Sequence, residues 1–339
     1  MKKYTDFAVA ARPGKPFTIL QISDMQVIDA AQRRYPERLS AVEIEKWETN
    51  RVEENCYRHI RSLVEEVRPD LIIVTGDIVY GEFDDTGRAL EDFLRFMGTL
   101  DTPWAPVYGN HDNESKRGVD WQCAQYAAAK NCLFARGTVS GNSNYTVGIY
   151  DGDVLVRVLY MMDTNACSGD DPAICHRLGL AEDQVQWMDD TAASIARKCG
   201  HIVPGFLCLH IPTADAVQAF AEAGYQKADE MHLPGAFRIG VDIAPAHEGD
   251  SGCKDEVVHP GGCSPAIADH LHADGIDGEF AGHCHKVNTS VYWDGIRYTF
   301  AVKCGTYDYH AAGQLGGSGI TLSADRKTFT VEPLYREIV

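Results

Sequence analysis

The stretch "LIIVTGDIVYGEF", residues 71–83, opens with a run of apolar residues and then breaks at a glycine. The run LIIVT at 71–75 predicts a strand covered on both faces, because such strands lack the alternation of polar and apolar residues. Gly76 allows a sharp turn and close approach of the backbone, and Asp77 follows with a carboxylate that can bind a metal. We therefore expect a central strand with Asp77 at its carboxyl end.

Other apolar segments on either side of this stretch also end at a residue that can bind a metal. Strands are expected at 17–23, 104–108, 201–210 and 276–281. The polar residues at their ends are Asp24, Asn110 with His111, His210, and the pair His283 and His285. Ligands gather in open α/β sheets where the carboxyl ends of strands open into loops, so these side chains are expected to meet in one site.

The remaining pattern indicates an α/β layered fold with mixed sheets. Helical spacing occupies 40–67, 86–98, 120–130, 181–198 and 265–273, hairpins are expected at 143–161 and 289–302, and a last strand or pair lies within 319–333. Residues 227–264 have weak periodicity; we expect an ordered loop beside the site, with a disordered excursion as the alternative. Length alone suggests two domains. Because the candidate ligands span residues 24 to 285, we expect a single domain over 1–339, with its core at about 17–310.

Composition limits the partners of the chain. Asp plus Glu number 49 and Lys plus Arg number 31 among 339 residues, a net charge of −18 that disfavours nucleic acid as a partner. The start, "MKKYTDFAVAARPGKP", has too short an apolar run for a secretory signal, so we expect a cytoplasmic protein without a membrane partner. The eleven cysteines are then expected to be reduced, with buried thiols at Cys56, Cys199, Cys208 and Cys304. The alternative is a bridge in pairs that flank loops, such as Cys253 with Cys263 or Cys167 with Cys175. The oligomeric state cannot be predicted.

The donor types at the strand ends indicate a metal site. Carboxylate, amide and imidazole ligands suit Fe, Mn, Zn or Co, and the cysteines show no spacing typical of a structural zinc site. Two metals about 3.5–4 Å apart need a bridging ligand, and both oxygens of Asp77 could bridge. Such a pair favours in-line displacement at phosphorus, with a metal-bound hydroxide as the nucleophile.

Five motifs, in this order, resemble those of the calcineurin-like metallophosphoesterases. They are "SDMQ" (23–26), "TGDIVYG" (75–81), "YGNHDNES" (108–115), "LHIP" (209–212) and "GHCHKVN" (282–288). The sequence looks most similar to the purple-acid-phosphatase-29-type and yeast-style phosphatases of that family. The resemblance implies a four-layer α/β/β/α sandwich with two mixed β-sheets.

The resemblance also implies roles for the site residues. Asp24, Asp77 and His285 would bind the first metal, with Asp77 bridging to a second metal held by Asn110, His210 and His283. His111 would face the phosphate and protonate the leaving oxygen or stabilise charge in the transition state. Asp112 would orient the His111 ring through a hydrogen bond.

One position departs from the family pattern. The family usually has Asp-x-His in the first motif, whereas this chain has Asp24-Met25-Gln26. Tyr80 stands in a GDxxY pattern similar to that of purple acid phosphatases, in which the tyrosine phenolate binds ferric iron. Three alternatives stay open: Tyr80 replaces the imidazole, Gln26 replaces it, or the ligand is lost.

The sequence thus predicts a dinuclear metal-dependent phosphatase that hydrolyses small phosphomonoesters. One alternative is a phosphodiesterase acting on cyclic nucleotides or phospholipid-derived diesters. Another is a non-catalytic scaffold with an impaired first metal site, which Gln26 favours. The candidate substrate contacts are Gln26, Asn113, Glu114, His247 and His259, the last two in the 227–264 loop.

Overall fold

One sheet of the fold has five strands. The computed structural model describes residues 4–29, 52–165, 179–223, 248–253, 256, 258, 265–311 and 313–337. In spatial order the sheet consists of β12 (Phe329–Arg336), β11 (Leu315–Leu322), β2 (Phe17–Ile22), β3 (Leu71–Thr75) and β4 (Trp104–Val107). Strands β2, β3 and β4 are parallel neighbours, whereas β11 is antiparallel to β2 and β12. All of β3 is buried, as its apolar sequence predicts.

The second sheet has seven strands. In spatial order they are β1 (Phe7–Ala11), β5 (Asn144–Asp151), β6 (Val154–Met162), β7 (Gly205–Cys208), β8 (Ile276–Ala281), β10 (Ile296–Phe300) and β9 (Ser290–Trp293). Strands β6, β7, β8 and β10 are parallel neighbours. The hairpins β5–β6 and β9–β10 add antiparallel pairs, so this sheet is mixed as well.

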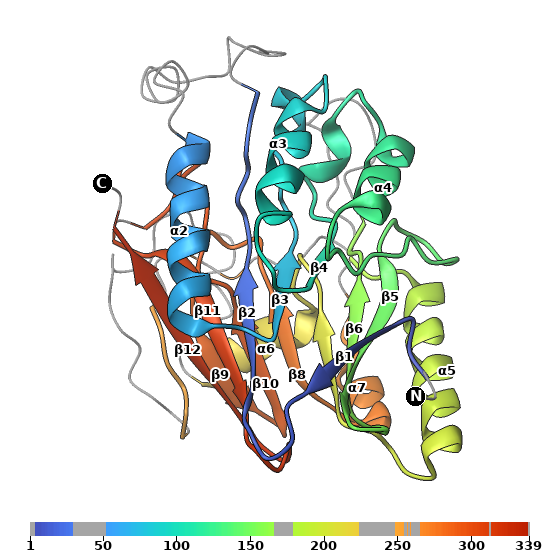
Figure 1. Cartoon of the computed structure of the whole chain (residues 1–339). Helices are drawn as coiled ribbons and strands as arrows, with labels where there is room; N and C mark the ends of the chain where they lie inside the picture. Colours follow the sequence, from blue (N-terminus) through green and yellow to red (C-terminus); the bar gives the residue numbers. More distant parts are fainter. Residues whose placement is uncertain are drawn as a thin grey trace.

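Helices cover the outer faces of the two sheets (Figure 1). Near the five-stranded sheet lie α2 (Val52–Val67), α3 (Arg88–Met97) and α4 (Val119–Ala128). Near the seven-stranded sheet lie α5 (Glu182–Cys199), α6 (Ala214–Glu222) and α7 (Ala268–Asp274). Two short 3₁₀ turns, η2 (Gly81–Phe83) and η3 (Asp112–Glu114), follow β3 and β4.

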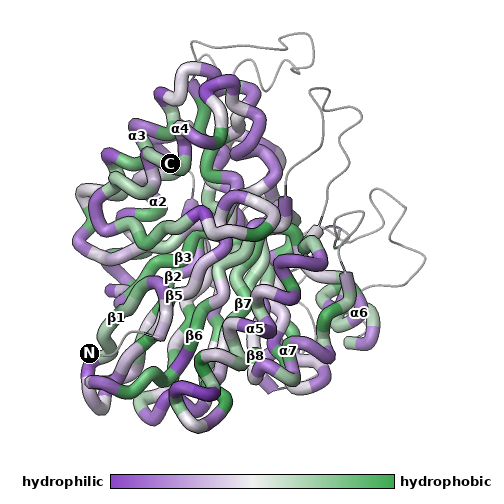
Figure 2. The backbone as a smooth tube through the Cα atoms, turned by 90° about the vertical axis from the view of Figure 1, so that its right-hand side faces the viewer, coloured by the Kyte–Doolittle hydropathy of each residue, from purple (hydrophilic) through white to green (hydrophobic). Residues whose placement is uncertain are grey.

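Strand β7 shows how the seven-stranded sheet contributes to two cores. Phe206 and Cys208 belong to the core shared with the five-stranded sheet, whereas Leu207 and Leu209 pack in the core beneath α5, α6 and α7. Alternate residues of a strand point to opposite faces, so both faces of this sheet are buried. Figure 2 shows the strands as largely hydrophobic segments between α2 on one side and α5 and α7 on the other. The predicted four-layer α/β/β/α sandwich is confirmed.

Most of the expected elements are present, with two additions. Residues 40–51 of the expected first helix and most of the 227–264 loop lie outside the described residues. The sequence analysis missed strand β1, which pairs in parallel with β5, and helix α6, which begins after the N-cap Thr213. Of the cysteines expected as thiols, Cys56, Cys208 and Cys304 are buried and unbridged, and Cys199 is unbridged and half-buried. Among the described helices, none is long and apolar enough to cross a bilayer.

Candidate metal centre

The centre forms where strands of both sheets end. Asp24, Asp77 and Asn110 follow β2, β3 and β4 of one sheet, and His210 and His283 follow β7 and β8 of the other. The pairing of β2 with β3 continues past the strands, because the Asp24 amide donates to the Gly76 carbonyl at 3.1 Å. The segment after β10 joins the sheets there, since the Cys304 amide donates to the Ser23 carbonyl at 2.9 Å.

Asp77 lies at the middle of the cluster. Its Oδ1 accepts a hydrogen bond from the backbone amide of His111 at 2.9 Å, and its Oδ2 lies 3.3 Å from Nε2 of His210. The same Nε2 lies 3.2 Å from Oδ1 of Asn110. Asp77, His210 and Asn110 are all buried, so these donor atoms face one another without intervening chain.

Asp24 is arranged in the same way on the other side. Its Oδ2 accepts from the backbone amide of His283 at 3.1 Å, and its Oδ1 lies 3.3 Å from Nε2 of His285. The His283 ring lies 5.3 Å, centroid to centroid, from the ring of His210. The structure therefore brings together all six of the ligand-type residues at strand ends, which are Asp24, Asp77, Asn110, His210, His283 and His285.

Backbone carbonyls fix which nitrogen of two histidines faces the cluster. Nδ1 of His210 lies 2.7 Å from the Thr75 carbonyl, and Nδ1 of His285 lies 3.1 Å from the Tyr309 carbonyl. A carbonyl can only accept, so each Nδ1 carries a proton and each ring turns its Nε2 toward a carboxylate. This second-sphere arrangement is the one that orients histidine ligands in metal sites.

The electrostatics of the cluster favour a cation. Burial alone would raise the pKa of Asp77, but His210 and His111 hold it below its usual range. Burial lowers the pKa of His210, but the Asp77 carboxylate outweighs this effect and raises the pKa to about 9. A buried carboxylate that stabilises a cationic imidazole this strongly would also stabilise a metal ion at the same place.

The donor set passes a direct test of fit to a metal. One ligand atom each from Asp24, Asp77 and His210 lie within 4.8 Å of one another. Oδ1 of Asp24 is buried without a hydrogen-bond partner, an arrangement that is costly unless a cation is bound. Carboxylate oxygens and imidazole nitrogens are the donors that Fe, Mn, Zn and Co accept.

The backbone is strained to deliver these donors. Asp24, Asp77 and His283 have φ angles of 54°, 51° and 73°, in the left-handed region that non-glycine residues rarely adopt. Gly109 permits the close approach of the loops, because a Cβ there would lie 2.2 Å from Oδ1 of Asp77. Local strain of this kind is typical of functional sites, where the surrounding fold maintains it.

All six ligand-type residues lie inside a region that one sequence family describes. The model of the calcineurin-like phosphoesterase family matches residues 17–287. The chain belongs to the calcineurin-like phosphoesterase family. The predicted resemblance is therefore confirmed.

Two relatives within this phosphoesterase family come from Arabidopsis thaliana. "Probable inactive purple acid phosphatase 28" is 26% identical over 310 residues, covering 83% of this chain and 72% of that protein. "Probable inactive purple acid phosphatase 29" is 22% identical over 289 residues, covering 78% and 69%. Among solved structures, a dimetal phosphatase from Danio rerio superposes with a TM-score of 0.51 at 12% identity, covering 94% of this chain and 99% of that one. That likeness shows the shared fold.

The family's candidate proton donor, His111, stands beside the cluster, but its partner differs from the expected one. Nδ1 of His111 lies 2.9 Å from Oε2 of Glu114. Asp112 does not hold the ring, contrary to expectation; its carboxylate accepts from the backbone amides of Val79 at 3.0 Å and Gly109 at 2.7 Å. The carboxylate of Asp112 is therefore committed to joining the two loops, and Glu114 orients the ring.

Tyr80 packs on the same histidine. Its ring stacks on the His111 ring at 4.3 Å between centroids and 23° between planes. Phe83 and Tyr307 contact the other sides of the Tyr80 ring. Burial and the nearby Asp308 and Glu114 raise the pKa of Tyr80 above its ordinary value. These contacts place the Tyr80 ring against His111, and none of them joins its oxygen to the cluster.

Gln26 faces a residue that the sequence analysis missed. Its Oε1 accepts from Nζ of Lys303 at 2.5 Å, and the same Nζ donates to the Asp24 carbonyl at 3.0 Å. Burial lowers the pKa of Lys303, although Asp24, Asp308 and Asp77 act in the opposite direction. A lysine inside the apolar segment "FAVKC" at 300–304 was the available signal, since a charge in such a run is seldom left unpaired.

The other candidate substrate contacts have different outcomes. The amide of Asn113 is engaged in the scaffold, donating to the Gly109 carbonyl and accepting from Asn142, each at 3.2 Å. Glu114 pairs with His111 as described above. His247 and His259 lie outside the described residues.

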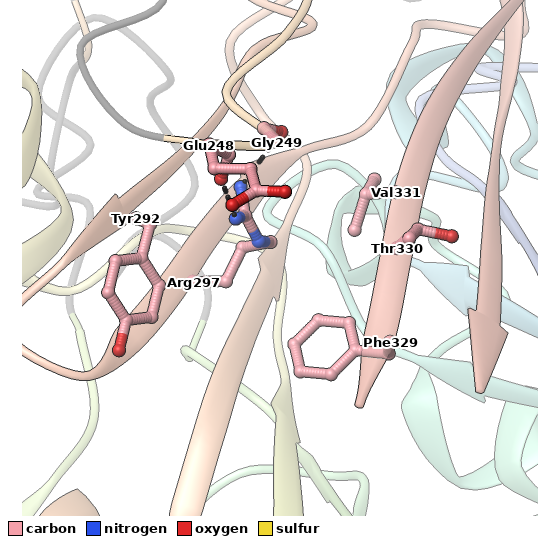
Figure 3. A pocket seen from close by; sticks show the side chains of 7 residues that line it. All are labelled: Glu248, Gly249, Tyr292, Arg297, Phe329, Thr330 and Val331. Carbon is pink, nitrogen blue, oxygen red and sulfur yellow. Dashed lines mark hydrogen bonds between the residues drawn. The ribbon is translucent and has the colours of Figure 1, made fainter. Parts of the chain in front are cut away.

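A separate hollow of about 540 Å³ lies on another part of the molecule (Figure 3). Phe329 in its wall pairs with Leu322, and Leu322 pairs with Phe17 at the amino end of β2. Asp24 follows the carboxyl end of β2, so the hollow and the cluster lie at opposite ends of this sheet. Arg297 in this hollow donates to the carbonyls of Gly249 and Glu248, at 3.0 and 3.1 Å. Because this guanidinium is already engaged, the hollow does not compete with the metal cluster as the candidate active site.

Proposed function

We propose that this calcineurin-like phosphoesterase is a metal-dependent hydrolase of small phosphomonoesters. One observation carries the proposal: His111 is anchored to the metal cluster through its backbone, while its ring is oriented by Glu114. The His111 amide bonds Asp77 at 2.9 Å and the ring bonds Glu114 at 2.9 Å. A scaffold without chemistry would have no need of an oriented imidazole beside a cluster of metal-type donors.

The ligands divide into two sets in this proposal. Asp24, Asp77 and His285 would hold a first metal, and Asp77 with Asn110, His210 and His283 would hold a second. The pair would be drawn from Fe, Mn, Zn and Co. When bound, the metals would supply Lewis-acid activation of the phosphate and of the attacking water.

The residues of the chain itself would position the substrate and handle the leaving group. Nδ1 of His111 is directed at Glu114, so Nε2 is the atom available to a substrate. A protonated His111 would donate from Nε2 to the departing alkoxide or to a phosphate oxygen. Burial lowers the pKa of His111, but Glu114 and Asp77 raise it to about 10, which keeps this proton in place.

Small substrates suit the charge of the chain. A net charge of −18 repels extended polyanions, whereas a small phosphomonoester can be neutralised by the metals alone. Tyr80 stays a candidate ligand of the first metal, but its stacking on His111 favours a role in positioning that ring.

Two rival functions remain, and only the scaffold has observations of its own in its favour. A phosphodiesterase would use the same metal centre and the same His111. A non-catalytic scaffold is favoured by the Gln26 departure and by two relatives that are named as probably inactive. The phosphodiesterase would differ from the proposal by cleaving diesters, and the scaffold would cleave no ester at all.

The deciding assay compares p-nitrophenyl phosphate with bis-p-nitrophenyl phosphate over a panel of Fe, Mn, Zn and Co. We expect higher kcat/KM on the monoester with at least one metal. Higher kcat/KM on the diester would favour the phosphodiesterase, and turnover of neither ester by a metal-loaded protein would favour the scaffold.

His111→Gln tests the role of the imidazole. We expect kcat to fall by roughly 10²- to 10⁴-fold, the usual contribution of a positioned general acid, with metal content unchanged. His272→Gln is the matched control, because His272 is a surface residue whose Nε2 lies 3.2 Å from Oδ2 of Asp294. Wild-type kcat in His111→Gln would contradict the assignment.

A further inference from the structure

Lys303 brings a buried ammonium group to the edge of the metal cluster. Lys303 is 1% exposed, and its backbone runs beside Ser23 in a parallel bridge that joins the two sheets. Its Nζ donates to the carbonyl of Asp24 at 3.0 Å. The ammonium is thus held next to a candidate ligand by the backbone of that ligand.

The same ammonium engages the Gln26 side chain. Oε1 of Gln26 accepts from Nζ at 2.5 Å, and Gln26 itself is fully buried. The carbonyl oxygen is the only atom of a glutamine amide that can bind a metal, and here Lys303 already engages one of its two lone pairs. Nε2 of Gln26, which cannot replace it, is buried without a hydrogen-bond partner.

The two candidate metal positions are therefore unequal. At the position around Asp77, Nε2 of His210 lies 3.3 Å from Oδ2 of Asp77 and 3.2 Å from Oδ1 of Asn110, and the His283 ring lies 5.3 Å from the His210 ring. The position around Asp24 and His285 lacks an imidazole at residue 26 and has a fixed positive group on the Asp24 side. A like charge a few ångströms away in a buried site lowers the affinity for a cation.

We propose that Lys303 and Gln26 replace the imidazole ligand of the first position, so that a divalent metal binds there at least tenfold more weakly than at the second position. The inference rests on the proposed metal centre and concerns its occupancy. With limiting metal the chain would hold one tightly bound cation at the second position, while the ammonium of Lys303 stays beside Asp24 at the first.

Calorimetric titration of the metal-stripped full chain with Co²⁺ tests the inference without any activity measurement. We expect two binding steps whose dissociation constants differ by at least tenfold. Lys303→Met removes the ammonium with a side chain of similar length, so the weaker step should tighten at least tenfold while the tighter step changes less than threefold. Gln26→His combined with Lys303→Met should tighten the weaker step further.

Lys130→Met is the control for loss of a lysine elsewhere. Lys130 lies at the surface near Asp101 and donates to the Gly98 carbonyl, so both steps should keep their wild-type constants. Circular dichroism and the melting temperature establish that each variant is folded. Should Lys303→Met not fold, the ratio of the two constants in the wild-type chain decides the question.

The outcomes separate this inference from the proposed function. A wild-type ratio below tenfold, or a ratio that Lys303→Met does not reduce, overturns the inference. If two cations bind with equal affinity and the protein hydrolyses phosphomonoesters, the inference alone fails. If no cation binds at all, the proposed function fails together with it.

Discussion

At the scale of single residues, the geometry of the candidate centre depends on a glycine as much as on the candidate ligands. Gly109 places its backbone against the Asp77 carboxylate, and a Cβ at this position would lie 2.2 Å from Oδ1. The contact is with a candidate ligand whose other oxygen lies 3.3 Å from Nε2 of His210. A single methyl group there would therefore displace the donor at the middle of the cluster.

Gly109→Ala should weaken Co²⁺ binding by roughly 10- to 100-fold, the range typical of changes next to a metal ligand. The displaced Asp77 carboxylate is the physical cause, and calorimetric titration is the measurement. Gly319→Ala in β11 is the control, because a Cβ there would meet its nearest atom at an ordinary 3.5 Å. Unchanged affinity in a folded Gly109→Ala protein would show that the loop relaxes without moving Asp77.

The candidate ligands could be predicted from the sequence because they follow apolar strands, and three of them, Asp77, Asn110 and His283, stand directly after a glycine. The partners of those residues could not. Lys303 reaches Asp24 across 279 positions of the chain, and only the fold places them together. Glu114 and Asp112 are two residues apart in the same turn, and the local sequence does not reveal which carboxylate meets the His111 ring.

At the scale of elements, buried carboxylates connect helices to strands. Glu279 in β8 accepts hydrogen bonds from the backbone amide and the hydroxyl of Thr213, the residue that caps α6. Burial raises the pKa of Glu279 to about 7, against the opposing effect of those hydrogen bonds. The folded chain therefore holds this proton more tightly than the unfolded chain does.

The sign of the pH effect follows from that difference. Protonated Glu279 stabilises the fold fully below the unfolded pKa of about 4.5, and the stability is lost as pH rises toward about 7. Glu279→Gln keeps a neutral polar group, so it should remove a slope of at most about 1.4 kcal/mol per pH unit from the free energy of unfolding. Urea denaturation from pH 4 to 8 is the measurement.

A matched control for Glu279→Gln lies on the surface. Glu182 is exposed at the start of α5, and Glu182→Gln should leave the pH profile of stability as it is in the wild type. If Glu279→Gln had the wild-type slope as well, the carboxyl group of Glu279 would be ionised in the folded chain at pH 5 to 7.

The elements themselves were predictable where a continuous apolar run or helical spacing marked them. β1 was missed because its five residues alternate weakly between buried and exposed, and its partner β5 lies about 140 residues away. α6 was missed because it is a short helix of nine residues that starts soon after the strand ending near His210. Such elements are stabilised by tertiary packing more than by local sequence.

At the scale of the whole molecule, the candidate ligands come from both sheets, so a bound metal would join the two central layers. Asp24, Asp77 and Asn110 follow strands of the five-stranded sheet, and His210 and His283 follow strands of the seven-stranded sheet. We therefore continue to propose a single domain over residues 1–339, which should unfold in one transition.

Removal of metal should lower the stability of the whole molecule. At a free metal concentration of 100 times Kd, one bound ion contributes about 2.7 kcal/mol, so EDTA dialysis should lower the melting temperature and Co²⁺ should restore it. Asp77→Asn is the comparison variant, and its melting temperature should respond less to either treatment. A wild-type melting temperature that is indifferent to both would show that the sheets do not share a bound ion.

Each of the two central carboxylates accepts a hydrogen bond from the backbone amide of a residue in another loop of the candidate centre. His111 secures Asp77, and His283 secures Asp24. The loops of His111 and His283 thus each carry candidate donors and also hold the carboxylate of a neighbouring loop in place. A substitution in one of these loops would therefore also displace the carboxylate of the neighbouring loop. The free-energy change of a double substitution would then be smaller than the sum of the two single changes.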